Sequence, residues 1–422
     1  MITETHLRSG RIEIVILTLL LVLGIFLRLP QSVFLGGDKP LHSLEFLHPE
    51  PKMNGMGFDE GLYRGYLNGI IDQGLGVYPE MVQEYVEVQG KMDQAILPPV
   101  RFLYIFAGYI WHLCFGSDAL ASLRQVASFF SILTLILSGI FAWRLRGRAT
   151  ALAITALMSC APTQIHMSQH ALIDGFFAFW ALLCLWMLWE NLQSGTNWRW
   201  IFAYTVALAL LVITKENSFF VWCGLVPVIV ANRWLQLGTV RRELLLATIA
   251  GPLLGVVILV FLAGGLDNLI ATYRVLVTKA SITPYAIMTG DGPWHRYLVD
   301  LLLVSPLVLL LALGAVFRLD RTKKPELFMA IFIAATYLIM CNVKYGMNLR
   351  YANMWDMPLR FLAFAQIGVL AALVPRYRTS LTAILVGLVA VFELRQYYIL
   401  AVQYPLYELV THDLLRALHI LK

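Results

Sequence analysis

Long apolar runs separated by short polar segments dominate the chain. A helix needs about 20 mostly apolar residues to cross the ~30 Å hydrocarbon layer of a bilayer, and many of the runs approach that length. We therefore predict an all-α integral membrane protein with about eleven transmembrane helices. The expected spans are residues 12–29, 119–143, 149–166, 174–190, 199–214, 217–232, 243–264, 297–317, 327–342, 357–374 and 379–394.

One further apolar stretch, residues 96–115, has nearly the length of a span but begins near Pro98-Pro99 and contains Arg101. Short cytoplasmic loops are enriched in Lys and Arg, and this rule decides how the stretch is read. If residues 96–115 do not cross the membrane, the predicted cytoplasmic loops hold 15 of the 32 Lys and Arg residues. If they do cross, every later loop changes sides, and only two of these 15 residues, both near the N-terminus, remain cytoplasmic. We therefore predict an interfacial or re-entrant helix. The 15 basic residues are Arg8, Arg11, Arg144, Arg146, Arg148, Arg199, Arg233, Arg241, Arg242, Arg318, Arg321, Lys323, Lys324, Arg376 and Arg378.

This topology gives one membrane domain over residues 1–422, with no soluble domain large enough to fold alone. Residues 30–118 form a first periplasmic loop that carries interfacial helices. Residues 395–422 are expected to form a C-terminal amphipathic helix on the membrane surface, because apolar side chains recur there every three to four positions. Those side chains are Leu406, Leu409, Val410, Leu414, Leu418 and Leu421.

The composition supports the membrane interpretation, since 59% of the 422 residues are hydrophobic and only 14% are charged. A soluble domain of this length needs more polar surface. The net charge of +6 follows from the basic loops, and no basic stripe interleaved with aromatic residues indicates nucleic-acid binding. The five cysteines show no metal-ligand spacing, which predicts free thiols.

Polar residues that are unusual for a membrane protein gather on the predicted outer side. Ionisable groups at the edge of the hydrocarbon are costly unless they are paired, hydrated or used, so they are candidates for a functional site. The alternative for any one of them is a structural ion pair between loops. The residues are Asp59, Glu60, Tyr63 and Arg64 in the first loop, then His166, His170, Asp174, Lys215, Glu216, Arg274, Lys279, Lys344, Arg350 and Tyr351.

Several short motifs in this order resemble the GT-C glycosyltransferases, in particular the group of protein O-mannosyltransferases and lipid A aminoarabinose transferases. Each motif is weak alone, but together they cover about residues 57–366. They are FDEGLYRGY from Phe58, the Leu-Pro-Pro at 97–99 with FGSDALASLRQVASFF from Phe115, SQHALIDGFFAFWALL from Ser168, LVITKENSFFV from Leu211 and NLRYANMWDMPLRFLA from Asn348.

The resemblance implies an inverting enzyme that moves a sugar, as a hexosyl or pentosyl group, from a polyprenyl-phosphate donor to a hydroxyl acceptor. A lipid phosphate leaves with help from cations, and a carboxylate accepts the proton of the attacking hydroxyl. Asp59 is the expected base, with Glu60 as the alternative, and Asp174 is a second catalytic carboxylate. Lys215, Arg350 and Tyr351 are expected to hold the donor phosphate. Possible site-lining residues are Tyr63, His170 and Arg274.

Other readings of these residues stay open at this point. Asp59 and Asp174 could each cap a helix, and the membrane protein could instead be a transporter or flippase of lipid-linked sugars, or a non-catalytic scaffold that binds a lipid phosphate. We expect no metal site and no required cofactor, although two carboxylates could hold a divalent cation. The expected partners are the lipid-linked sugar, membrane lipid and an acceptor glycan, lipid or protein, without nucleic acid. The expected location is the inner (plasma) membrane, with the site facing the periplasm.

Overall fold

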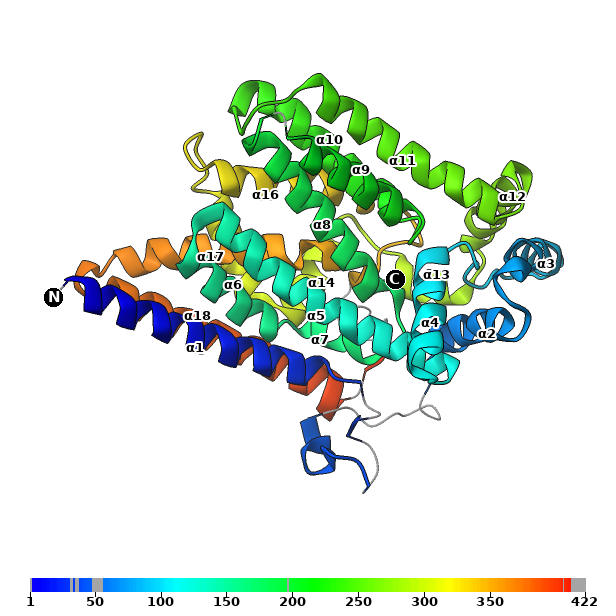
Figure 1. Ribbon diagram of the computed structural model, residues 1–422, viewed down its shortest axis with the longest axis horizontal. Helices are drawn as coiled ribbons and strands as arrows, with labels where there is room; N and C mark the ends of the chain where they lie inside the picture. Colours follow the sequence, from blue (N-terminus) through cyan, green and yellow to red (C-terminus); the bar gives the residue numbers. More distant parts are fainter. Residues whose placement is uncertain are drawn as a thin grey trace.

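The computed structural model describes residues 2–30, 33–34, 38–47, 56–195, 197–404 and 406–410, without the side chains of residues 2–11, 285, 288 and 289. Within these residues the chain is helical and contains no strand (Figure 1). The all-α fold class predicted from the sequence is thus confirmed.

Each expected span coincides with one helix or with a pair of helices. Five stretches of the described chain are by themselves long and apolar enough to cross a membrane, namely α5, α8, α10, α11 and the last run from Pro375 to Gln403. The chain is therefore a multi-pass membrane protein, while the count of eleven crossings stays a prediction. The helices of the expected spans are α1 (Ile2–Arg28), α5 (Ala119–Arg146), α6 (Arg148–Ser159), α7 (Pro162–Gln169), α8 (Ile173–Gln193), α9 (Trp198–Val212), α10 (Ser218–Leu235), α11 (Arg242–Leu262), α14 (Arg296–Val304), α15 (Pro306–Val316), α16 (Lys324–Met340), α17 (Asp356–Ala372) and α18 (Arg378–Tyr397).

Two of the expected spans are interrupted by proline. We predicted one helix for each of the spans 149–166 and 297–317, and the structure divides each of them into two. The first divides into α6 and α7 before Pro162, and the second into α14 and α15 before Pro306. A proline has no backbone N–H and its ring collides with the carbonyl group four residues earlier, so a helix ends before it or kinks.

Two buried arginines satisfy the carbonyl groups at the break between α6 and α7. The last carbonyl groups of a helix lack partners inside the helix. Arg28, at the end of α1, donates to the carbonyl oxygens of Met158 at 2.6 Å and Ser159 at 3.1 Å. Arg360 of α17 donates to the carbonyl oxygen of Leu157 at 3.2 Å. The break is therefore held by α1 and α17, and it fixes the direction in which α7 leaves.

Helices of the connecting loops gather at one end of the bundle, on the right of Figure 1. There α4 packs against α2 and α5, and α12 packs against α3. The α4 helix has 14 residues, about 21 Å of length, and by itself it does not reach the length of a full span. That residues 96–115 do not cross the membrane stays a prediction. The bounds are α2 (Phe58–Gln73), α3 (Tyr78–Lys91), α4 (Phe102–Phe115), α12 (Leu266–Ala280) and α13 (Pro284–Gly290).

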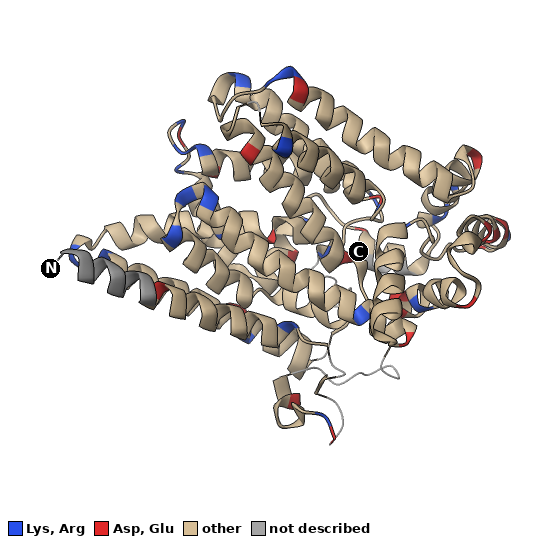
Figure 2. Cartoon of the chain, in the orientation of Figure 1, with Lys and Arg blue, Asp and Glu red and all other residues tan. Residues whose placement is uncertain are grey.

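The basic segments that were predicted to share the inner side lie together at the other end of the helices. In Figure 2, Lys and Arg concentrate at helix ends on the left and upper left. Arg146, at the end of α5, pairs with Glu326 in the first turn of α16 at 2.6 Å, and Arg148 lies 3.9 Å from Glu13 of α1. We refer to this side, where α5 ends and α16 begins, as the basic end of the bundle.

The C-terminal segment departs from its prediction. We predicted an amphipathic interfacial helix over residues 395–422, and for residues 406–410 this was wrong. Residues Tyr398–Gln403 form a π-helical turn, and residues 406–410 are not helical. Leu409 and Val410 are 4% and 8% exposed, so they pack inside the protein. An apolar repeat fits burial against protein as well as burial against lipid, and tertiary contacts decided between them. Leu414, Leu418 and Leu421 lie outside the described residues.

Candidate active site

Glu60, in the first turn of α2, is fully engaged in structural contacts. Its carboxylate accepts hydrogen bonds from the backbone N–H groups of Gly57 and Ala171, each at 2.7 Å. Arg124 donates to both oxygens at 2.9 and 3.1 Å. Burial opposes ionisation, but the neighbouring His170 and Arg124 outweigh it and hold the pKa of Glu60 below its usual value. Glu60 therefore caps α2 and ties this helix to α5 and to the segment before α8.

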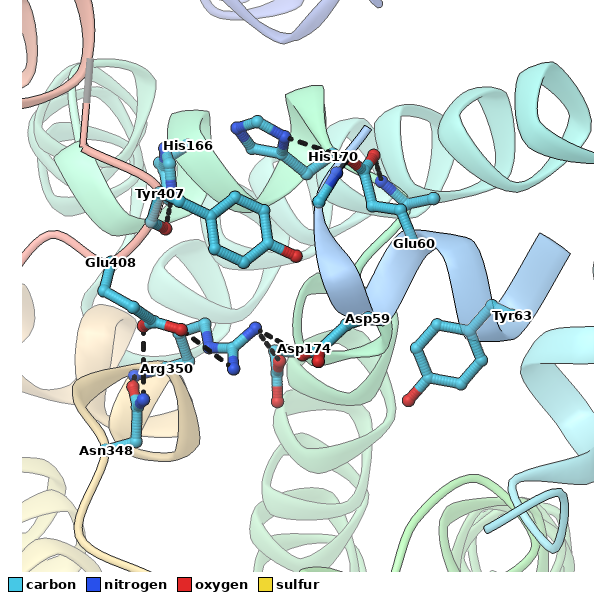
Figure 3. Close-up of polar contacts among 12 residues, drawn as sticks. Asp59, Glu60, Tyr63, His166, His170, Asp174, Asn348, Arg350, Tyr407 and Glu408 are labelled. Atoms are coloured by element: carbon cyan, nitrogen blue, oxygen red, sulfur yellow. Dashed lines mark hydrogen bonds and ion pairs between the residues drawn. The ribbon is translucent and has the colours of Figure 1, made fainter. Parts of the chain in front are cut away.

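Asp59 points away from these contacts and toward Arg350, because neighbouring side chains on a helix diverge by about 100°. Its Oδ2 atom lies 3.0 Å from Nη1 of Arg350 (Figure 3). The alternative that Asp59 caps the helix is wrong, since the capping position is Gly57 and its N–H is bonded by Glu60. Of the two acids that the sequence could not separate, Asp59 is the one that faces Arg350.

Arg350 joins three acidic side chains from distant parts of the chain. Besides Asp59, its Nη1 atom lies 3.9 Å from Oδ2 of Asp174, and its Nη2 atom lies 3.0 Å from Oε1 of Glu408. The short helix η4 (Leu349–Trp355) positions the arginine, and the side chain of Asn348 starts that helix by accepting from the N–H of Arg350 at 2.9 Å. Asn348 also donates to Oε2 of Glu408 at 3.1 Å.

Lys215 pairs with Asp174 at the start of α8. The Nζ–Oδ1 distance is 2.5 Å, and Nζ also lies 4.0 Å from the ring centre of Tyr351. Burial lowers the pKa of Lys215, although the carboxylate beside it acts in the opposite direction. Asp174 does not cap α8 with its side chain, because the capping position is Leu172 and no side-chain cap bond is formed. Its negative charge still suits the positive end of the helix.

The five charged groups Asp59, Asp174, Lys215, Arg350 and Glu408 form one buried cluster, which we call the carboxylate–cation cluster. Their side chains are between 1% and 13% exposed. Buried charges are costly unless they are paired, and here three negative groups face two positive ones, so the ionised cluster has a net charge of −1. Lys215 and Arg350 are strong hydrogen-bond donors to an oxyanion, and Asp59 is a proton acceptor beside them.

The three predicted site-lining residues, Tyr63, His170 and Arg274, differ in how close they lie to the carboxylate–cation cluster. Tyr63 is buried and accepts a 2.5 Å hydrogen bond from Arg101, while burial raises the pKa of its phenol group. His170 lies with its ring 5.3 Å from the Tyr407 ring. Arg274 is exposed on α12, and in the described part of the chain no hydrogen bond or ion pair joins it to the cluster. The structure thus does not bring Arg274 to the site.

Several residues near the cluster were missed by sequence reasoning. Arg101 pairs with Glu216 and holds Tyr63, although its position in an apolar stretch was the only signal. Glu408 was assigned to a membrane-surface helix. Tyr407 lies against Gly57, where an added Cβ atom would come within 2.3 Å of the tyrosine ring. A side chain at residue 57 would therefore displace the Tyr407 ring, and the C-terminal segment packs directly against the start of α2.

The described residues contain no group of three or more His, Cys, Asp and Glu side chains arranged to hold a metal ion. Asp59 and Asp174 already pair with Arg350 and Lys215, so a divalent cation shared by the two carboxylates would have to displace these partners. His166 and His170 lie with ring centres 4.8 Å apart, and His166 Nε2 is bonded to the carbonyl oxygen of Tyr407 at 2.8 Å. That the site needs no metal stays a prediction.

Comparison with known proteins supports the predicted resemblance. Residues 78–272 match the family model described as dolichyl-phosphate-mannose-protein mannosyltransferase. Among curated protein sequences no match was found. The archaeal oligosaccharyltransferase AglB from Archaeoglobus fulgidus, in complex with an inhibitory peptide and a dolichol-phosphate, matches at 14% identity and a TM-score of 0.59, covering 93% of this chain and 56% of that one.

A second solved structure, ArnT from Cupriavidus metallidurans bound to undecaprenyl phosphate, matches at 14% identity and a TM-score of 0.51, covering 93% of this chain and 72% of that one. The chain spans little more than half the length of AglB. At these identities the structures establish the fold, and the predicted GT-C fold is confirmed.

Proposed function

We propose that this protein, whose fold is that of the GT-C glycosyltransferases, transfers a sugar from a polyprenyl-phosphate donor to a hydroxyl acceptor with inversion at the anomeric carbon. The observation that carries the proposal is the carboxylate–cation cluster, in which Asp59 and Asp174 both lie beside Arg350 and Asp174 also pairs with Lys215. The family match and the lipid phosphates bound by ArnT and AglB support the same chemistry. Transfer by one displacement breaks the bond from the anomeric carbon to the phosphate oxygen and forms a bond to the acceptor oxygen.

Lys215 and Arg350 would hold the donor phosphate. Two cations stabilise the charge that grows on the leaving phosphate oxygen, and their effect is strongest in a buried, water-poor site. Tyr351 lies against Lys215 and restricts where its ammonium group can point. The phosphate adds negative charge to a cluster that is already −1, so one carboxylate has to leave. Glu408 is the candidate, because among the three carboxylates of the cluster it alone lies in a non-helical segment.

Asp59 would accept the proton of the acceptor hydroxyl. Positioned general bases typically contribute about 10²–10⁴ in rate. Glu60 is unsuited to this role because its oxygens already accept hydrogen bonds from two backbone groups and Arg124. Asp174 would orient Lys215 and, through it, the phosphate.

The cluster lies at the end of the helices opposite the basic end. Asp174 is in the first turn of α8 and Asp356 opens α17 beside η4, whereas the basic residues follow the far ends of α5, α15 and α17. Because basic loops stay in the cytoplasm, we place the site at the periplasmic surface of the plasma membrane. The acceptor would be a glycan, lipid or protein that carries a hydroxyl group.

The proposal is tested with the purified full-length protein in lipid vesicles. A panel of polyprenyl-phosphate sugars is supplied with candidate acceptors, and free polyprenyl phosphate and glycosylated acceptor are measured together. Asp59→Asn should abolish transfer, while Asp72→Asn, the same change at an exposed position of the same helix, should not. Movement of the lipid-linked sugar across the vesicle membrane without release of polyprenyl phosphate would instead support the transporter hypothesis.

A further inference from the structure

A large apolar groove lies at the basic end of the bundle, far along the helices from the carboxylate–cation cluster. It has a volume of about 1080 Å³ and runs between α1, α6, α15, α17 and α18. Its walls are mostly small and apolar side chains, for example Ala153 and Ala156 of α6 and Val386 of α18. The proposed transfer reaction does not use this groove.

The mouth of the groove carries cations. Arg146, Arg318, Lys323 and Arg378 all line it, together with Glu13 and Glu326. Arg146 is paired with Glu326 at 2.6 Å, and Lys323 lies 3.3 Å from Asp320. Arg318 and Arg378 are exposed, and neither forms an ion pair with any side chain that the structure describes. Two guanidinium groups thus stand at the entrance of an apolar groove.

The floor of the groove keeps space for a chain-like molecule. Gly368 of α17 and Gly387 of α18 both line the groove, and a Cβ atom added to either one would meet nothing within 4 Å. Gln366 also lines it, is 8% exposed, and its Oε1 atom accepts no hydrogen bond within the described chain. Gln366 lies six residues before Ala372, the end of α17, which is about 9 Å along the axis. The groove therefore offers one polar contact a short way below its cationic mouth.

We propose that this groove binds an anionic glycerophospholipid from the leaflet at the basic end of the bundle. Basic pockets between transmembrane helices bind anionic lipid headgroups by charge attraction, and here Arg318 and Arg378 would take the phosphate. The acyl chains lie along Gly368 and Gly387, and the side-chain amide of Gln366 contacts the glycerol and ester region. The site is independent of the proposed transfer chemistry.

The test measures lipid binding to the purified full-length protein by native mass spectrometry, with phosphatidylglycerol and phosphatidylcholine of the same acyl chains. Phosphatidylglycerol should be retained at least tenfold more tightly. The double variant Arg318→Ala/Arg378→Ala should weaken its binding about 30-fold, from the attraction that each basic residue contributes, and should leave phosphatidylcholine unchanged. A matched control is Arg321→Ala/Arg376→Ala, which removes the same charge from exposed positions beside the groove.

A second pair of variants tests the groove rather than the charge. Gly368→Leu and Gly387→Leu fill open space and replace glycine by a better helix former, so the helices should form normally. Each should reduce binding of both lipids. Equal losses in the groove and control arginine variants would overturn the proposal, because the attraction would then belong to the whole surface. Retention of polyprenyl phosphate in place of phosphatidylglycerol would also overturn it.

Discussion

Replacing Asp59 by Asn exchanges one carboxylate oxygen for an NH₂ group and leaves the size of the side chain almost unchanged. The remaining oxygen can still accept from Nη1 of Arg350, which lies 3.0 Å from the carboxylate. The position of Arg350, and hence the phosphate site, should be preserved. What is lost is the capacity to accept a proton from the acceptor hydroxyl.

The expected loss follows from the contribution of a positioned general base, about 10²–10⁴ in kcat, or roughly 2.7–5.5 kcal/mol of transition-state stabilisation. Glu60 cannot replace the missing base, because its oxygens are held by Gly57, Ala171 and Arg124. The ionised cluster also changes from a net charge of −1 to zero. Binding of polyprenyl phosphate by Asp59→Asn should therefore be at least as strong as by the wild type.

The assay pairs two measurements on the same vesicles. Release of free polyprenyl phosphate under saturating donor gives kcat, and binding of radiolabelled polyprenyl phosphate gives the affinity. Asp72→Asn, at the exposed end of α2, is the matched control and should behave as the wild type in both. A kcat for Asp59→Asn within about threefold of the wild type would remove Asp59 as the base. Loss of phosphate binding together with kcat would show that Asp59 acts by positioning Arg350.

Further predictions concern the other charges at the site. Lys215→Met should lower kcat by about 10²–10³, because one of two donors to the leaving phosphate is lost. Glu408→Gln should lower the KM for the donor about fivefold at unchanged kcat, because it weakens the contact that the phosphate must displace from Arg350. Glu60→Gln should destabilise the protein by about 2–3 kcal/mol in thermal unfolding, because it removes the buried carboxylate that pairs with the Arg124 guanidinium. The pKa of Glu60 is lowered in the folded protein, so its stabilisation is full above its ordinary value of 4.5 and is lost as the pH falls below it. The Glu60→Gln variant should lack this acid-dependent loss.

Each of these results has an opposite that contradicts the reasoning. An unchanged kcat in Lys215→Met would place the phosphate elsewhere. A raised KM in Glu408→Gln would mean that the glutamate assists donor binding. Equal acid sensitivity of the wild type and Glu60→Gln would assign the pH dependence to another carboxyl group.

The helical membrane fold could be predicted from the sequence because it depends on a local property. An apolar run of sufficient length has to satisfy its backbone hydrogen bonds internally, so it becomes a helix whatever its neighbours are. The same reasoning predicted a short separate helix at α4, since the distribution of Arg and Lys indicates that residues 96–115 do not cross. This reasoning did not predict the helix breaks before Pro162 and Pro306. Membrane helices tolerate proline, so the presence of a proline does not by itself show that a helix ends there.

The sequence by itself also determined which residues could lie together in one site. Asp59, Asp174, Lys215 and Arg350 follow from the order of motifs and from the side of the membrane on which each loop must lie. Only the tertiary structure decided the pairing, because contacts between residues far apart in the sequence depend on how the helices pack. It turned Asp59 toward Arg350 and Glu60 toward Arg124, and it brought Glu408 from a predicted surface helix into the cluster.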